Sequence, residues 1–152
     1  MEEQQIEMKH YFNELMDTIL ADGKVGLVPQ LSPKFVDCDC NELSLTLEFV
    51  VRDWMINPEK ILFGGALMSM FDNAYGFLCH YFAGKNFIST ISHSTVFLKS
   101  AMLGDTIQVK VKADSHGRTI VNMSGEAKDI SSGKMIGTSQ TSFMILNKTV
   151  TL

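Results

Sequence analysis

The sequence has little of what several specialised protein classes require. Its three cysteines are an odd number, too few for a disulfide scaffold, and its four histidines are scattered without metal-ligand spacing. No apolar run approaches the ~20 residues of a membrane span, and the acidic N-terminus is unlike a signal peptide. We therefore expect a cytoplasmic protein with no metal site and no membrane partner.

Clustered basic charge is also missing. The chain has 13 Lys and Arg against 17 Asp and Glu, a net charge of −4, whereas nucleic-acid binding depends on grouped basic residues. We expect no nucleic-acid partner.

The length of 152 residues, 45% of them hydrophobic, is typical of one globular domain. We predict a single domain over residues 1–152, with residues 1–25 as an N-terminal helix that packs on it.

Hydrophobic periodicity predicts the order of the elements. A helix is expected over 3–21, a loop with two prolines over 26–33, and a long helix over 66–82 that is apolar on almost every side. The predicted strands are two within 35–52, divided near Asn41, and four more over 88–99, 106–113, 118–128 and 134–146.

Helices and strands are segregated in this order, which favours an α+β fold with an antiparallel sheet. A helix that is apolar on every side is a buried helix. A sheet that curls around residues 66–82 would explain that pattern.

Asp72 is the one acid in the long apolar helix. An unpaired carboxylate is costly in such surroundings and therefore needs a reason. One interpretation is a general base or nucleophile in an apolar pocket. The other is that Asp72 faces a subunit interface or caps a neighbouring stretch of backbone.

Gly64 and Gly65 stand at the start of the same helix. Free backbone N–H groups and the positive end of the helix dipole meet there, and together they can hold an oxyanion. The alternative is a tight turn that lets the helix pack closely. Eight residues separate Gly64 from Asp72, about 12 Å along a helix. If both act on one carbonyl, they must come from two antiparallel helices of a homodimer.

The motifs from Asn57 to Phe143 resemble one known family. They are Asn57, Phe63-Gly64-Gly65, Asp72, Thr90, Leu103-Gly104-Asp105 and His116-Gly117-Arg118. In this spacing the sequence is similar to hotdog-fold acyl-CoA thioesterases of the PaaI type. The resemblance implies a curved antiparallel sheet wrapped around the central helix, and a homodimer or a dimer of dimers. It also implies an acyl-CoA substrate, so that coenzyme A enters only as part of the substrate and no other cofactor is expected.

The resemblance also implies roles for individual residues. Asp72 is expected to activate water or attack the thioester, the N–H of Gly64 to polarise its carbonyl, and Asn57 and Thr90 to position water and substrate. The substrate-binding residues are expected to be Phe63, Gly65, Ser92, Phe97, Ser115, His116, Gly117 and Arg118. Thr90, Ser92 and Ser94 are expected to share one face of their strand, because side chains in a strand alternate.

Phe63 departs from the family pattern, which has His before the two glycines. The change replaces a hydrogen-bonding group with an aromatic ring. It favours a second hypothesis, a non-catalytic domain that binds acyl-CoA or lipid. A third, a hydroxyacyl dehydratase, needs a His paired with the acid, and position 63 does not supply one.

Overall fold

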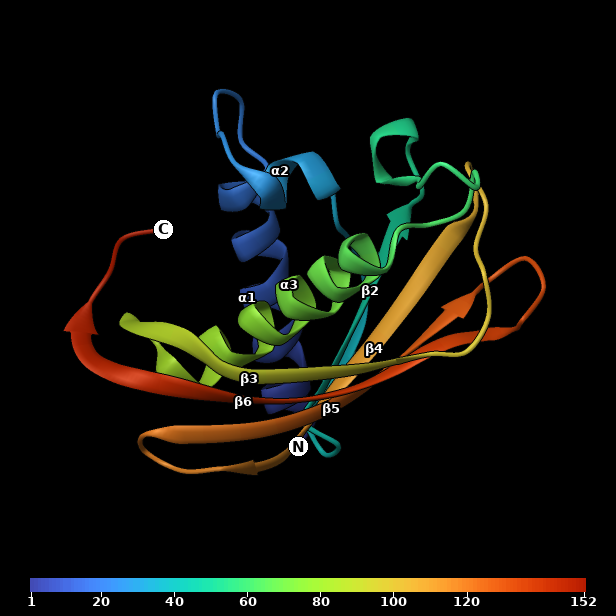
Figure 1. Ribbon diagram of the computed structural model, residues 1–152. Coiled ribbons are helices and arrows are strands. Elements are labelled where there is room, and N and C mark those ends of the chain that lie inside the picture. The colour runs from blue at the N-terminus through green and yellow to red at the C-terminus, as the bar shows by residue number, and fades with distance from the viewer.

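The computed structural model describes residues 1–152 and has the predicted order of elements (Figure 1). The helices are α1 (Glu2–Ile19), α2 (Leu27–Leu31), the short 3-10 helix η1 (Asp53–Met55) and α3 (Gly64–Ala83). The strands are β1 (Lys34–Asp39), β2 (Ser44–Val50), β3 (Asn86–Phe97), β4 (Thr106–His116), β5 (Ile120–Asp129) and β6 (Met135–Thr149). No helix is long and apolar enough to span a membrane.

The six strands form one antiparallel sheet in the order β1-β2-β4-β5-β6-β3. The sheet curves, and α3 lies along its concave face (Figure 1). This arrangement confirms the predicted fold class, a hotdog fold with an additional N-terminal helix.

Glycines let α3 lie close to the strands beneath it. A Cβ atom at Gly125 of β5 would lie 3.0 Å from the Tyr75 hydroxyl oxygen, and one at Gly137 of β6 would lie 3.1 Å from a methyl group of Leu67. These are tight contacts with large side chains of the helix. The two positions therefore set how closely the helix approaches the sheet.

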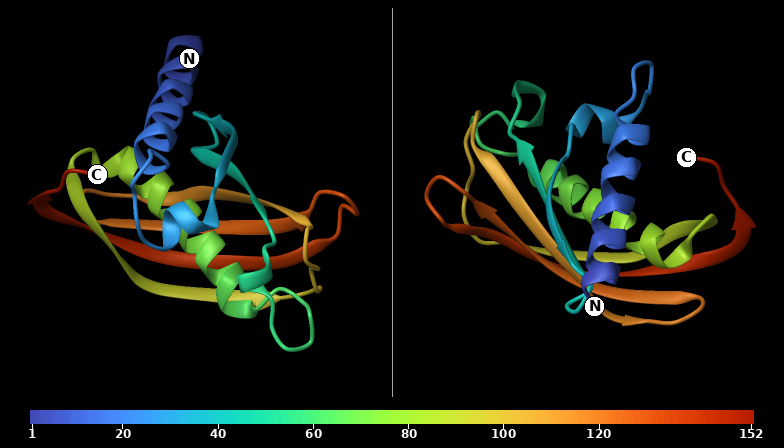
Figure 2. Two further views of the ribbon diagram at one scale, coloured as in Figure 1. Left: turned by 90° about the horizontal axis from the view of Figure 1, so that it is seen from above. Right: turned by 180° about the vertical axis from the view of Figure 1, so that it is seen from behind.

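Two predictions about local structure are wrong. The segment 26–33 is not all loop, because Leu27–Leu31 forms the short helix α2 with Pro29 in its first turn, where a proline is tolerated. The second error concerns α3, which is not buried on every side. The sheet covers one side, α1 and α2 cover part of another (Figure 2), and the side around Met68, Asp72 and Gly76 is only half-buried.

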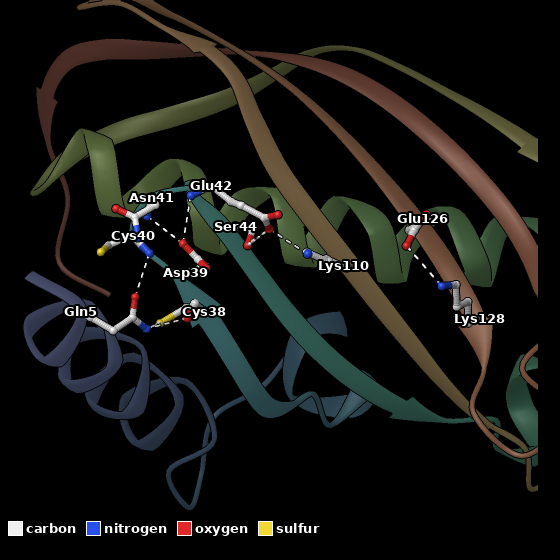
Figure 3. Close-up of polar contacts among 10 residues, drawn as sticks. All are labelled: Gln5, Cys38, Asp39, Cys40, Asn41, Glu42, Ser44, Lys110, Glu126 and Lys128. Atoms are coloured by element: carbon white, nitrogen blue, oxygen red, sulfur yellow. Dashed lines mark hydrogen bonds and ion pairs between the residues drawn. The ribbon is translucent and has the colours of Figure 1, made fainter. Parts of the chain in front are cut away.

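The two edges of the sheet differ. At the edge strand β1, the Gln5 side chain of α1 donates a hydrogen bond to the Cys38 carbonyl oxygen (2.6 Å) and accepts one from the Cys40 N–H (2.9 Å) (Figure 3). A neighbouring strand would make the same pair of bonds, so α1 covers this edge.

The other edge, β3, is 12 residues long and pairs only with β6. A long uncovered edge is a surface for pairing with another chain.

Helix α1 shares the hydrophobic core of the sheet and α3. Phe12 is 0% exposed, and its ring centre lies 5.8 Å from that of Tyr81 in α3 and 6.1 Å from that of Phe35 in β1. We expect Phe12→Ala to lower the free energy of unfolding by about 3–5 kcal/mol, because it leaves a cavity in this cluster. Chemical denaturation would measure the loss.

Ile6→Ala is the matched control on the same helix. Ile6 is 63% exposed, and its truncation should change the free energy of unfolding by less than about 0.5 kcal/mol. A similarly small effect of Phe12→Ala would contradict the prediction that the chain is one cooperative domain.

Candidate active site

Asp72 and Thr90 meet where α3 crosses β3. The Thr90 hydroxyl donates a hydrogen bond to the Asp72 carboxylate, with 2.9 Å between the oxygens. Asp72 is half-buried, because β3 is the last strand of the sheet and leaves this side of α3 partly open. The carboxylate is thus held by one hydrogen bond and retains free acceptor positions.

A cavity of about 520 Å³ opens beside this pair. Such a volume is typical of small-ligand pockets. Its α3 and strand residues are Met68, Ser69, Asp72, Asn73, Gly76, Phe77, His80, Ile88, Thr90, His93 and Phe143. The end of α1 and helix α2 close another side with Ile19, Leu27, Val28 and Leu31, and Leu152 completes the wall. An acid therefore faces a mainly apolar chamber.

A β-bulge changes which β3 side chains face this chamber. Thr90 pairs with Phe143 of β6 and Ser92 with Ser142, so Ile91 is the extra residue. Beyond the bulge, His93 lies opposite the buried Thr141 and points inward with Thr90. The prediction that Thr90, Ser92 and Ser94 share one face is therefore wrong, because a bulge breaks the alternation on which it rested.

His93 is one of four polar cavity residues that the sequence patterns did not single out, with Ser69, Asn73 and His80. Its Nε2 lies 2.8 Å from the Ser139 hydroxyl, and its ring packs edge-on against Phe71 and Tyr75. Burial lowers the pKa of His93, and the nearby Asp72 charge partly opposes that shift. No sequence spacing marks His93, because the β-bulge turns it inward, whereas Asn73 and His80 lie seven residues apart on one face of α3, a spacing that could have linked them.

Gly64 lies at a second, smaller cavity of about 310 Å³, which Asn57 also lines. As the first residue of α3, Gly64 has a backbone N–H without an acceptor inside the helix. The Asn57 side-chain oxygen accepts hydrogen bonds from the N–H groups of Glu59 (3.0 Å) and Ile61 (3.3 Å). Asn57 thus holds the loop before the helix, and only its amide nitrogen is free for another partner.

Two aromatic rings flank the start of α3. A Cβ atom at Gly65 would lie 2.7 Å from the Phe63 ring, and one at Gly64 would lie 3.2 Å from the Phe97 ring. Phe63 is 57% exposed and Phe97 53% exposed. The Phe63 ring folds back over Gly65, so a larger residue there would require this exposed ring to shift, and the helix start has an apolar, solvent-facing rim.

One chain does not bring all of the predicted site residues together. Asp72 and Thr90 line the larger cavity, whereas Asn57, Gly64 and Phe97 line the smaller one. The helix rise from Gly64 to Asp72 is about 12 Å. In one chain the predicted site residues therefore lie at two separate cavities.

The turn between β4 and β5 lies away from both cavities. His116 stacks on Phe82 near the end of α3, with 4.5 Å between ring centres. Ser115 accepts a hydrogen bond from Asn122 (3.0 Å), and the Gly117 N–H donates one to the Ile120 carbonyl (2.8 Å). Arg118 is exposed. In one chain these four residues contact neither Asp72 nor Gly64.

Comparison with known proteins agrees with this fold. The Escherichia coli PaaI protein of the phenylacetic acid degradation operon superposes on this chain with a TM-score of 0.77 and 17% sequence identity. The superposition covers 93% of this chain and 96% of the PaaI chain. A putative thioesterase related to phenylacetic acid degradation, from Ralstonia eutropha, covers 88% of this chain and 98% of its own, with a TM-score of 0.74 and 23% identity.

Some similar structures contain a ligand. A Streptococcus mutans protein bound to acetyl-CoA covers 86% of this chain and 98% of its own, with a TM-score of 0.70 and 18% identity. No curated protein matches the chain in sequence. The sequence model of the thioesterase superfamily matches residues 59–136, slightly more than half of the chain, and these residues include α3 with Gly64 and Asp72, and Thr90 of β3. The chain therefore belongs to the thioesterase superfamily.

Proposed function

We propose that the protein hydrolyses an acyl-CoA thioester to a free acid and CoA. The observation that carries this proposal is the Asp72 carboxylate, bonded to Thr90 (2.9 Å) at the wall of a largely apolar 520 Å³ cavity. The cavity suits an acyl group, and the acid suits activation of water. The structures of relatives with CoA or acetyl-CoA support the choice of thioester.

The chemistry needs a base, or a nucleophile, and an oxyanion donor. As a base, Asp72 takes a proton from water, and the resulting hydroxide attacks the thioester carbonyl. As a nucleophile, its carboxylate attacks the carbonyl directly, and water then hydrolyses the anhydride. In both routes the carbonyl oxygen becomes an oxyanion that the N–H of Gly64 stabilises, and its collapse breaks the C–S bond. In the first route the protonated Asp72 returns its proton to the CoA thiolate, and in the second the thiolate takes a proton from solvent water.

A homodimer would bring these groups together. Strand β3 offers an uncovered 12-residue edge with exposed apolar residues Ile91, Val96 and Phe97. Antiparallel pairing of β3 with a second β3 would place the two α3 helices antiparallel across a two-fold axis. Gly64 of the partner subunit would then face Asp72. The dimer would have two complete sites, each formed by Asp72 of one chain and Gly64 of the other.

Gly64→Pro tests the oxyanion donor. Proline fits the first position of a helix, and Phe63 already has the extended backbone, φ −65° and ψ 135°, that a following proline requires. The substitution removes the N–H and should lower kcat about 100-fold. Gly64→Ala is the control, because it keeps the N–H and adds the same contact with the exposed Phe97 ring. Equal activity of the two variants would contradict the assignment.

Mixing Gly64→Pro with Asp72→Asn tests whether the site is shared. After subunit exchange, half of the dimers are mixed, and each mixed dimer has one site with an intact Asp72 and an intact Gly64. About a quarter of wild-type activity should therefore return. If each chain carried its own complete site, both chains would be defective and the mixture would stay inactive.

Release of free thiol from a broad panel of acyl-CoA esters tests the proposal as a whole. Turnover of at least one ester that depends on Asp72 is the expected result. Saturable binding of the esters without hydrolysis would instead support the non-catalytic acyl-CoA-binding domain that the Phe63 substitution favours.

A further inference from the structure

A row of polar side chains follows α3 along the larger cavity. The polar residues Ser69, Asn73 and His80, together with Gly76, which has no side chain, are spaced by four, three and four residues, which places them on one face of the helix. All four line the cavity. The opposite walls, from α1, α2 and the strands, are mainly apolar. A chamber for a plain hydrocarbon chain would not need this row.

Two members of the row lack hydrogen-bond partners. Ser69 donates to the Gly65 carbonyl (2.8 Å), but neither the oxygen nor the nitrogen of the Asn73 amide has a partner, and nor does Nδ1 of His80. Asn73 is only 6% exposed. Buried polar groups are almost always paired, so each exception requires an explanation.

We propose that the unpaired Nδ1 of His80 recognises a hydroxyl on the acyl chain of the substrate, so that the enzyme prefers medium-length ω-hydroxyacyl-CoA esters over unsubstituted ones. The inference rests on the proposed function. The carbonyl would lie at Asp72, with Asn73 at the same end, and the chain would run along α3 to His80.

Helix geometry sets the length of the chain. Eight residues separate Asp72 from His80, about 12 Å along the axis. An extended zigzag of about ten carbons, with bonds of about 1.5 Å, covers a similar distance. The cavity volume of about 520 Å³ is ample for such a chain.

The lining favours a neutral hydroxyl over a charged group. It contains Asp72 but no Lys or Arg. A carboxylate at the end of the acyl chain would therefore have no cation to pair with and would be repelled by Asp72. Burial lowers the pKa of His80, which favours the uncharged ring. A hydroxyl both donates and accepts, so it can pair with Nδ1 in either neutral tautomer.

The test compares ω-hydroxydecanoyl-CoA with decanoyl-CoA. We expect wild-type kcat/KM to be about tenfold higher for the hydroxylated ester, the effect of about one neutral hydrogen bond to an otherwise unpaired group. His80→Phe should abolish this preference. His10→Phe is the control, because His10 is exposed and pairs with Glu14 (3.2 Å) on α1.

Calorimetric binding of ω-hydroxydecanoic and decanoic acids gives a second readout that needs no turnover. Equal kcat/KM values for the two esters and equal affinities for the two acids would overturn the inference but leave the thioesterase proposal standing. If no ester is hydrolysed, the proposed function fails, and tighter binding of the hydroxylated acid, lost in His80→Phe, would still support the inferred site.

Discussion

Replacing Asp72 with asparagine is expected to lower kcat for acyl-CoA hydrolysis about 1,000-fold, within the range that a positioned acid–base group contributes. Asparagine keeps the shape and can still accept the Thr90 hydrogen bond that spans 2.9 Å. It cannot take a proton from water or form an anhydride. The loss should therefore appear in kcat, with little change in affinity for the substrate.

The control for this change is Asp17→Asn. Asp17 is an exposed acid on α1 outside both cavities, and the variant should retain wild-type kcat. Steady-state release of thiol measures both proteins. An Asp72→Asn enzyme with wild-type kcat would remove the acid from the mechanism.

Placing a charge in the middle of β3 is expected to abolish both the dimer and the activity. Ile91 is the bulge residue of β3 and is 52% exposed. With two antiparallel β3 strands paired about a two-fold axis, the two copies of this central residue lie close together. Ile91→Glu or Ile91→Lys would place like charges there, which is destabilising in a cross-strand pair.

Each variant should be a monomer by analytical ultracentrifugation and should lose at least about 100-fold in kcat/KM, because Asp72 no longer meets the oxyanion donor of a second chain. Mixing the two variants should form a heterodimer, with opposite charges facing each other, and recover activity. This recovery separates lost pairing from misfolding.

Val36→Glu is the matched control on the opposite edge. Val36 is the bulge residue of β1 and is 39% exposed. It lies on the edge that Gln5 covers, so its change should leave dimer and activity intact. A fully active monomeric Ile91→Glu protein would show that one chain suffices and would refute the shared site.

The sequence by itself determined the fold class and the separation between Gly64 and Asp72 along their helix. Periods of two and of about 3.6 residues are local properties, so they located the six strands, α1 and α3 to within a few residues. The same regularity placed Gly64 and Asp72 on one helix about 12 Å apart and implied that one chain could not join them.

Only the tertiary structure decided which side chains share the cavity with Asp72. A bulge at Ile91 turns His93 inward and Ser92 outward, and packing brings α2, more than 40 residues away in sequence from Asp72, over the same cavity. Strand order leaves β3 uncovered, while Gln5 covers β1. These outcomes depend on contacts between distant segments, which no local period records.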